Sequence, residues 1–200
     1  MLRRLISRFI GRTDCLLHAR DLPGSPFAES GVKVPVVFRL NCPESLRILG
    51  SHDVRYDLDE RHVREIPEQL AQGEVCVSGW VGTELAFYVW VQFKHRRLAR
   101  LTRVPLSKSQ AAIYRGFTRE DFRGQRIYTA ALHYTCRWLA EKGCRRVLVD
   151  HDVRNVASQK GIASAGFRPL GEYRVHKFCG LKWATLGESL RNELSKELHG

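Results

Sequence analysis

The chain has 200 residues, 44% of them hydrophobic, and a formal net charge of +12. This is enough for one compact domain with a buried core, and no stretch approaches the roughly twenty apolar residues that span a bilayer. The six scattered cysteines form no Cys-x-x-Cys pair, and the eight histidines show no metal-binding spacing. We therefore expect no metal, no disulfide framework, and a cytoplasmic, reducing location.

The positive charge suits several anionic partners. Coenzyme A, nucleic acid and an anionic membrane surface would all be attracted by such a field. The sequence carries no RNP-like, helix-turn-helix or zinc-finger pattern, however. Nucleic acid is therefore not expected as the main partner.

The first twelve residues have the pattern of a basic amphipathic helix. Apolar residues recur at helical spacing, with arginines between them. Such a segment suits an anionic membrane surface, and the alternative is a terminal helix docked on the domain. Residues 21–26 carry two prolines and a glycine, which predicts a turn or linker. We assign residues 1–30 to a basic N-terminal extension and linker, and leave peripheral membrane contact through residues 1–12 open.

The middle of the chain predicts helices and then strands. Residues 45–70 read as helical. Two runs rich in β-branched and aromatic residues follow, at 73–77 and 85–91, and indicate a hairpin.

The segment at residues 118–128 joins a predicted strand, 110–117, to a predicted helix, 125–141. A strand that turns into a helix start presents unpaired backbone N–H groups at the positive end of the helix dipole. Gly124 would let the backbone approach a ligand, and Arg123 and Arg126 add fixed positive charge. The pattern favours a phosphate or pyrophosphate site. The alternative is an ordinary turn with exposed arginines.

The last third continues the alternation of strand and helix. A short buried strand is predicted at 146–150, and a helix begins near Asn155 and ends at Gly166-Phe167. A β-rich run follows at 172–183. The amphipathic segment at 186–198 could dock on the domain or pair with another subunit, so both a monomer and a homodimer stay open.

Taken in order over residues 72–183, these elements resemble the acyl-CoA-binding core of the GNAT superfamily of N-acyltransferases. The resemblance implies an α/β (α+β) fold with a twisted, mostly antiparallel central sheet flanked by helices. It places a GNAT-like acyltransferase domain at residues 31–183, followed by a C-terminal amphipathic helix at 184–200.

The resemblance also implies a reaction. An acetyl or other acyl group would pass from acyl-CoA to an amine of a small-molecule or peptide acceptor, by direct attack in a ternary complex. Asn155 and Ser158 match positions near the cofactor thiol, although Asn155 could equally serve as a helix N-cap. The residues implied for acyl-CoA binding are Phe117, Thr118, Arg123, Gly124, Gln125, Arg126, Ile127, Tyr128, Asn155 and Ser158.

The chain departs from the family's usual loop, Arg/Gln-x-x-Gly-x-Gly/Ala. Arg126 stands at the second Gly, and Tyr128 stands at the small third residue. Arg126 either points away or contacts a phosphate itself, and Tyr128 would narrow the channel beside the pantetheine arm. Ile162 stands where the family often has a Tyr that protonates the departing thiolate. No catalytic residue is assigned, and the candidates are Tyr114, Tyr173 and Ser158.

Two other functions stay open. A GNAT-like fold also occurs in peptidyl transferases that use aminoacyl-tRNA, but those enzymes lack a pyrophosphate loop, so Arg123-Gly124 argues against that function. A non-catalytic basic module that binds coenzyme A or another anion would fit the altered loop and Ile162.

Overall fold

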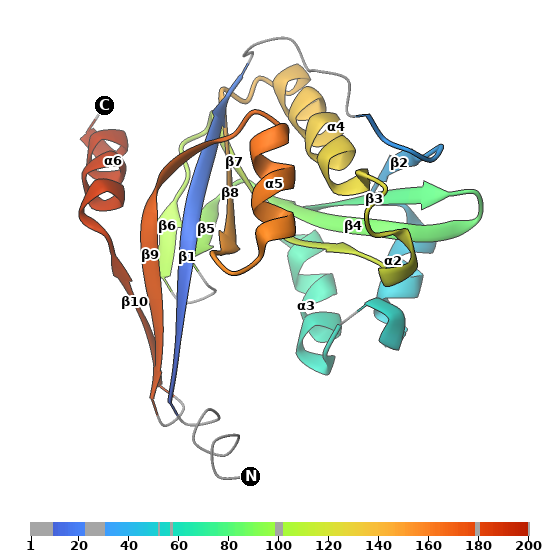
Figure 1. The fold of residues 1–200 in the computed structure, drawn as a ribbon, viewed down its shortest axis with the longest axis horizontal. Helices are drawn as coiled ribbons and strands as arrows, with labels where there is room; N and C mark the ends of the chain where they lie inside the picture. Colours follow the sequence, from blue (N-terminus) through green and yellow to red (C-terminus); the bar gives the residue numbers. More distant parts are fainter. Residues whose placement is uncertain are drawn as a thin grey trace.

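The computed structural model describes residues 10–22, 31–51, 53–56, 58–98, 102–178 and 181–199. Figure 1 shows one twisted sheet that runs through the molecule, with helices on both of its faces. In these residues an eight-stranded sheet has the order β10-β9-β1-β8-β7-β4-β3-β2, and β5 and β6 form a separate hairpin. The strands are β1 (Ile10–Asp21), β2 (Val37–Leu40), β3 (Val75–Val81), β4 (Glu84–Gln92), β5 (His95–Leu98), β6 (Thr102–Pro105), β7 (Gln110–Thr118), β8 (Arg146–Asp152), β9 (Arg168–Phe178) and β10 (Leu181–Leu186).

Every strand pair of the main sheet is antiparallel except β7 and β8. The predicted mixed fold with a mostly antiparallel sheet is therefore confirmed. The described part of the chain also forms five α-helices and two short 3-10 turns. They are α2 (Pro43–Gly50), α3 (Glu60–Ala71), α4 (Ile127–Glu141), α5 (Val156–Ser164), α6 (Glu188–His199), η1 (Val54–Tyr56) and η2 (Glu120–Phe122).

Alternating side chains divide the core into two layers. Val89 on β4 packs with α4 and α5 on one face, whereas its neighbours Tyr88 and Trp90 pack with α2 and α3 on the other. At the opposite end of that second face, α6 packs through Leu190 and Leu194 against β1, β8 and β9. This period of two is what a strand buried on both faces requires.

The N-terminal extension differs from the prediction. Residues 1–9 and 23–30 lie outside the described residues, but residues 10–21 form β1, which pairs with β9 on one side and β8 on the other. The strand therefore belongs to the domain, not to a segment ahead of it. Cys15, Leu17 and Ala19 recur at a spacing of two and fill the core, a strand pattern that the arginines and the helical spacing of residues 1–12 obscured.

Candidate active site

The parallel strands β7 and β8 separate before they end. They pair only from Gln110 to Ile113 on β7 and from Arg146 to Val149 on β8. Just beyond this point the register of β7 against β4 shifts, and Arg115 has a positive φ of 54°. An irregularity of this kind bends a strand away from its partner. A cavity of about 170 Å³ lies in the gap, lined by the ends of both strands.

The predicted anion loop connects β7 to α4. Gly124 has φ +75°, in the left-handed region, and a Cβ built on it would meet no atom within 4 Å. α4 begins at Ile127 with no capping side chain and no acidic residue in its first turn. Its first N–H groups and the positive end of its dipole therefore have no capping side chain and face no carboxylate of that turn.

This loop lines a second cavity, of about 950 Å³. The N-terminus of α5 forms the other wall. Asn155 caps α5, because its Oδ1 accepts a hydrogen bond from the Ser158 N–H at 3.0 Å. The N-cap prediction for Asn155 is therefore confirmed, and both Asn155 and Ser158 also line the cavity.

The sequence profile described as Acetyltransferase (GNAT) family matches residues 55–167, more than half of the chain. The chain belongs to the GNAT acetyltransferase family. No curated protein matches its sequence significantly.

Solved structures agree with this family in fold. A GNAT-family acetyltransferase from Colwellia psychrerythraea is 16% identical with a TM-score of 0.59, over 88% of this chain and 60% of that one. A GCN5-related N-acetyltransferase from Sphaerobacter thermophilus is 13% identical with a TM-score of 0.57, over 93% and 56%. AAC(6')-Iy, solved in complex with the bisubstrate analog CoA-S-monomethyl-acetylneamine, is 18% identical with a TM-score of 0.53, over 67% and 91%. The chain thus spans about 60% of the length of the Colwellia protein.

This GNAT chain places an arginine where the loop glycine is usual, yet keeps the glycine backbone. Arg126 has φ 61°, a conformation that costs a residue with a side chain about 1–2 kcal/mol. A Cβ built on Gly31 would lie 2.7 Å from Nη1 of Arg126. The guanidinium therefore lies against Gly31. This position agrees with the first of the two predicted roles, in which Arg126 points away from the backbone cradle.

Tyr128 occupies the junction of the two cavities, which share four lining residues: Gly116, Tyr128, Asn155 and Ser158. Its ring lies between two glycines on different elements. A Cβ on Gly161 of α5 would be 2.7 Å from its Cδ1, and a Cβ on Gly116 of β7 would be 3.3 Å from its Cε2. Burial raises the pKa of Tyr128 to about 12, although a hydrogen bond with the Ser158 side chain opposes the rise.

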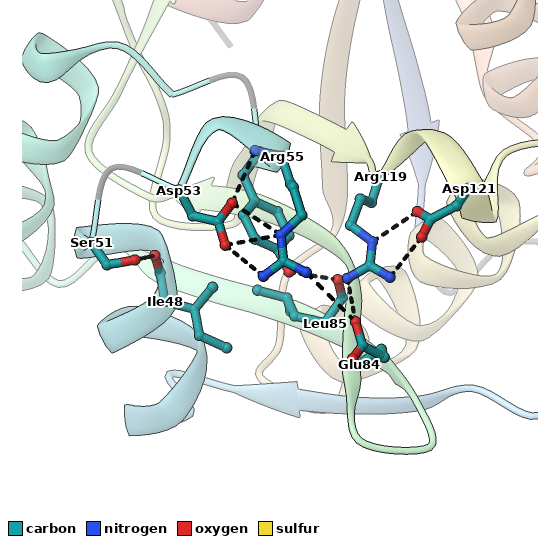
Figure 2. Close-up of polar contacts among 9 residues, drawn as sticks. Ile48, Ser51, Asp53, Arg55, Glu84, Leu85, Arg119 and Asp121 are labelled. Carbon is teal, nitrogen blue, oxygen red and sulfur yellow. Dashed lines mark hydrogen bonds and ion pairs between the residues drawn. The ribbon is translucent and has the colours of Figure 1, made fainter.

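The loop is held from outside by a network of ion pairs (Figure 2). The guanidinium of Arg119, only 8% exposed, donates to both carboxylate oxygens of Asp121 at 2.7 Å and also to Glu84. It also lies over the Phe122 ring, 4.7 Å from the centroid. Arg55 approaches the same Glu84 carboxylate, at 3.9 Å. The Arg119 side chain thus connects the loop to Glu84 at the start of β4.

The structure separates the three tyrosines considered from the sequence. The Tyr114 hydroxyl donates a hydrogen bond to Glu74 and accepts one from Gln69. Burial, and after it the contact with Glu74, raises the pKa of Tyr114. Tyr173 packs in the core beneath α6, and its hydroxyl donates to Asp150. Tyr114 lines the small cavity, and Tyr173 does not. Of the three tyrosines, only Tyr128 lines the large cavity. A catalytic role for Tyr114, Tyr173 or Ser158 stays a prediction.

Ile162 also lies differently from what its position in the family suggests. Its side chain is fully buried in the core between α4, α5 and the sheet. A Tyr at this position would have to enter the packed core or displace it. The phenol that lines the cavity comes from α4 instead.

Nine of the ten residues predicted to bind acyl-CoA line the large cavity; Gln125 does not. The Gln125 carbonyl instead accepts a hydrogen bond from the Lys33 N–H at 3.1 Å. Sequence reasoning missed Gly116, Lys160 and Gly161, which also line it. A glycine inside a strand or a helix signals close approach of another group, so Gly116 and Gly161 carried a readable signal, whereas Lys160 carried none.

Among the described residues, no three or more His, Cys, Asp and Glu side chains cluster in a way that could hold a metal ion. No helix in that part of the chain is long and apolar enough to cross a membrane.

Proposed function

We propose that this protein transfers an acyl group, by default acetyl, from acyl-CoA to the amine of a small-molecule or peptide acceptor. One observation carries the proposal. The N-termini of α4 and α5 and the glycine loop surround one large cavity, which adjoins the gap between β7 and β8.

The residues present fit coenzyme A. Gly124 leaves the backbone open at the uncapped start of α4, where a pyrophosphate would accept hydrogen bonds from backbone N–H groups. Arg123 and Lys160 line the same cavity and supply positive charge, whereas the Arg126 guanidinium lies against Gly31. When bound, acyl-CoA supplies an activated thioester. Backbone groups of Phe117 and Thr118, at the end of β7, would hold the pantetheine arm beside the gap.

The chemistry required of the protein is mainly positioning. An amine in the smaller cavity would meet the thioester where β7 and β8 diverge, and a well-oriented pair of reactants gains a large rate advantage. AAC(6')-Iy, which shares this fold, was solved in complex with a CoA-derived bisubstrate analog. That complex supports the proposal by analogy of fold.

The test is titration calorimetry with acetyl-CoA on Gly124→Val. The new side chain would block backbone approach, and we expect affinity to fall about tenfold to a hundredfold, as for a lost charge-assisted hydrogen bond. The matched control is Gly143→Val, because Gly143 has a similar φ of +81° and open space around it but lies beyond the far end of α4. It should suffer the same backbone strain and bind normally.

Unchanged affinity in a folded Gly124→Val protein would refute the site. Release of free thiol from acetyl-CoA in a screen of amines then tests turnover. Binding without turnover of any amine would favour the non-catalytic basic module, and tight binding of tRNA in place of acetyl-CoA would favour the peptidyl transferase.

A further inference from the structure

The ring of Tyr128 stands at the passage between the two cavities. The large cavity is walled by the loop and the start of α5, and the small one by the diverging ends of β7 and β8. If the thioester of acyl-CoA meets the acceptor in the gap, its acyl group lies beside this ring, which lines both cavities. This step rests on the proposed function.

The ring is held in place from several sides. Gly116 and Gly161 flank it so closely that a Cβ on Gly161 would overlap Cδ1. The ring of Phe87 lies 6.1 Å away between centroids, and Ser158 lines both cavities together with Tyr128. Because protein interiors are close-packed, a ring seated on two glycines yields little to a ligand.

A large side chain on one element faces small residues on two others. A large side chain enters from the first turn of α4, and small residues on β7 and α5 make room for it. The space beside α5 that a longer acyl chain would need is therefore occupied by Tyr128. Ile162 on α5 is fully buried in the same core cluster, so the core offers no further space there.

We propose that Tyr128 is a specificity-determining residue that limits the transferred acyl group to short chains, with acetyl preferred. An acetyl group ends before the ring, whereas each further methylene would contact it. Removal of the ring would join the two cavities through an apolar space. A longer chain could then bury its methylene groups there, which is worth roughly fourfold in affinity for each group.

The experiment measures dissociation constants of acetyl-, butyryl- and hexanoyl-CoA by calorimetry, with wild type, Tyr128→Ala and Tyr128→Phe. Wild type should bind hexanoyl-CoA no better than acetyl-CoA. In Tyr128→Ala the ratio of the two constants should shift toward hexanoyl-CoA by at least about tenfold, the equivalent of two buried methylene groups. Tyr128→Phe keeps the ring, so its ratio should equal that of wild type.

Tyr134→Ala is the matched control. Tyr134 lies on the same helix, but its ring stacks on Phe38 at 5.1 Å and does not line either cavity. Its ratio should stay at the wild-type value. Tyr128→Leu, which fills more of the seat, provides an intermediate case if Tyr128→Ala does not fold.

The outcomes separate this inference from the proposed function. If wild type binds none of the three thioesters, the proposed function fails and the inference fails with it. If wild type binds acetyl-CoA but the ratio is the same in the folded alanine or leucine variant, Tyr128 does not set chain length. An equal shift in Tyr128→Phe would also overturn the inference, because it would assign the effect to the hydroxyl group.

Discussion

The close contact between the Tyr128 ring and Gly161 leads to a quantitative prediction for Gly161→Ala. In a helix interior this change normally raises the free energy of unfolding by about 1 kcal/mol, since alanine loses less conformational entropy on folding. Here the new Cβ would lie 2.7 Å from Cδ1 and 3.2 Å from Cε1 of Tyr128. Overpacking of this kind costs about 1–3 kcal/mol. The overpacking cost therefore exceeds or cancels the gain of about 1 kcal/mol from the helix. We expect Gly161→Ala to lower the free energy of unfolding of the otherwise unaltered protein by up to about 2 kcal/mol.

A double-mutant cycle isolates the contact. In the Tyr128→Ala background the obstacle is gone, so Gly161→Ala should stabilise the protein by about 1 kcal/mol. The coupling between the two positions should then be about 1–3 kcal/mol. Urea unfolding followed by circular dichroism gives each free energy, provided that the slope with denaturant is unchanged among the variants.

Gly50→Ala is the control for helix propensity. Gly50 is the last residue of α2, and a Cβ there would meet nothing within 4 Å. It should be neutral or stabilising in every background. If Gly161→Ala stabilises the wild-type protein as Gly50→Ala does, the ring is not seated as described, and the chain-length argument loses its structural basis.

Two further predictions concern the loop. Arg119→Lys keeps the charge but cannot form the two parallel bonds to Asp121 and the third to Glu84. We therefore expect a loss of about 1–3 kcal/mol in the free energy of unfolding, and weaker acetyl-CoA binding by calorimetry. Unchanged stability would show that the network contributes little. Arg126→Gly should raise the unfolding free energy by about 0.5–1 kcal/mol, because glycine adopts φ 61° without steric cost. Acetyl-CoA affinity should change little in that variant, and a tenfold loss would instead place the guanidinium on a phosphate.

Local sequence determined most elements and the loop itself. The hairpin of β3 and β4, the strand β7, and the helices α4 and α5 follow from periodicity and end signals within short windows, which need no partner to be read. The Asn155 cap is of the same kind, because its hydrogen bond spans only three residues. Gly124 and the uncapped start of α4 could likewise be recognised, since one glycine and one helix end define an anion-binding geometry.

Only the tertiary structure decided what these pieces meet. β1 lies between β8 and β9. These partner strands come more than a hundred residues later in the chain, so the short apolar run does not reveal the pairing. Tyr114 and Tyr173 do not line the large cavity, and their hydroxyl groups bond Glu74 and Asp150, partners 40 and 23 residues distant. The place of Tyr128 was decided by glycines on two other elements. Such contacts depend on how the sheet and helices pack, and packing joins residues whose separation along the chain carries no signal of their contact.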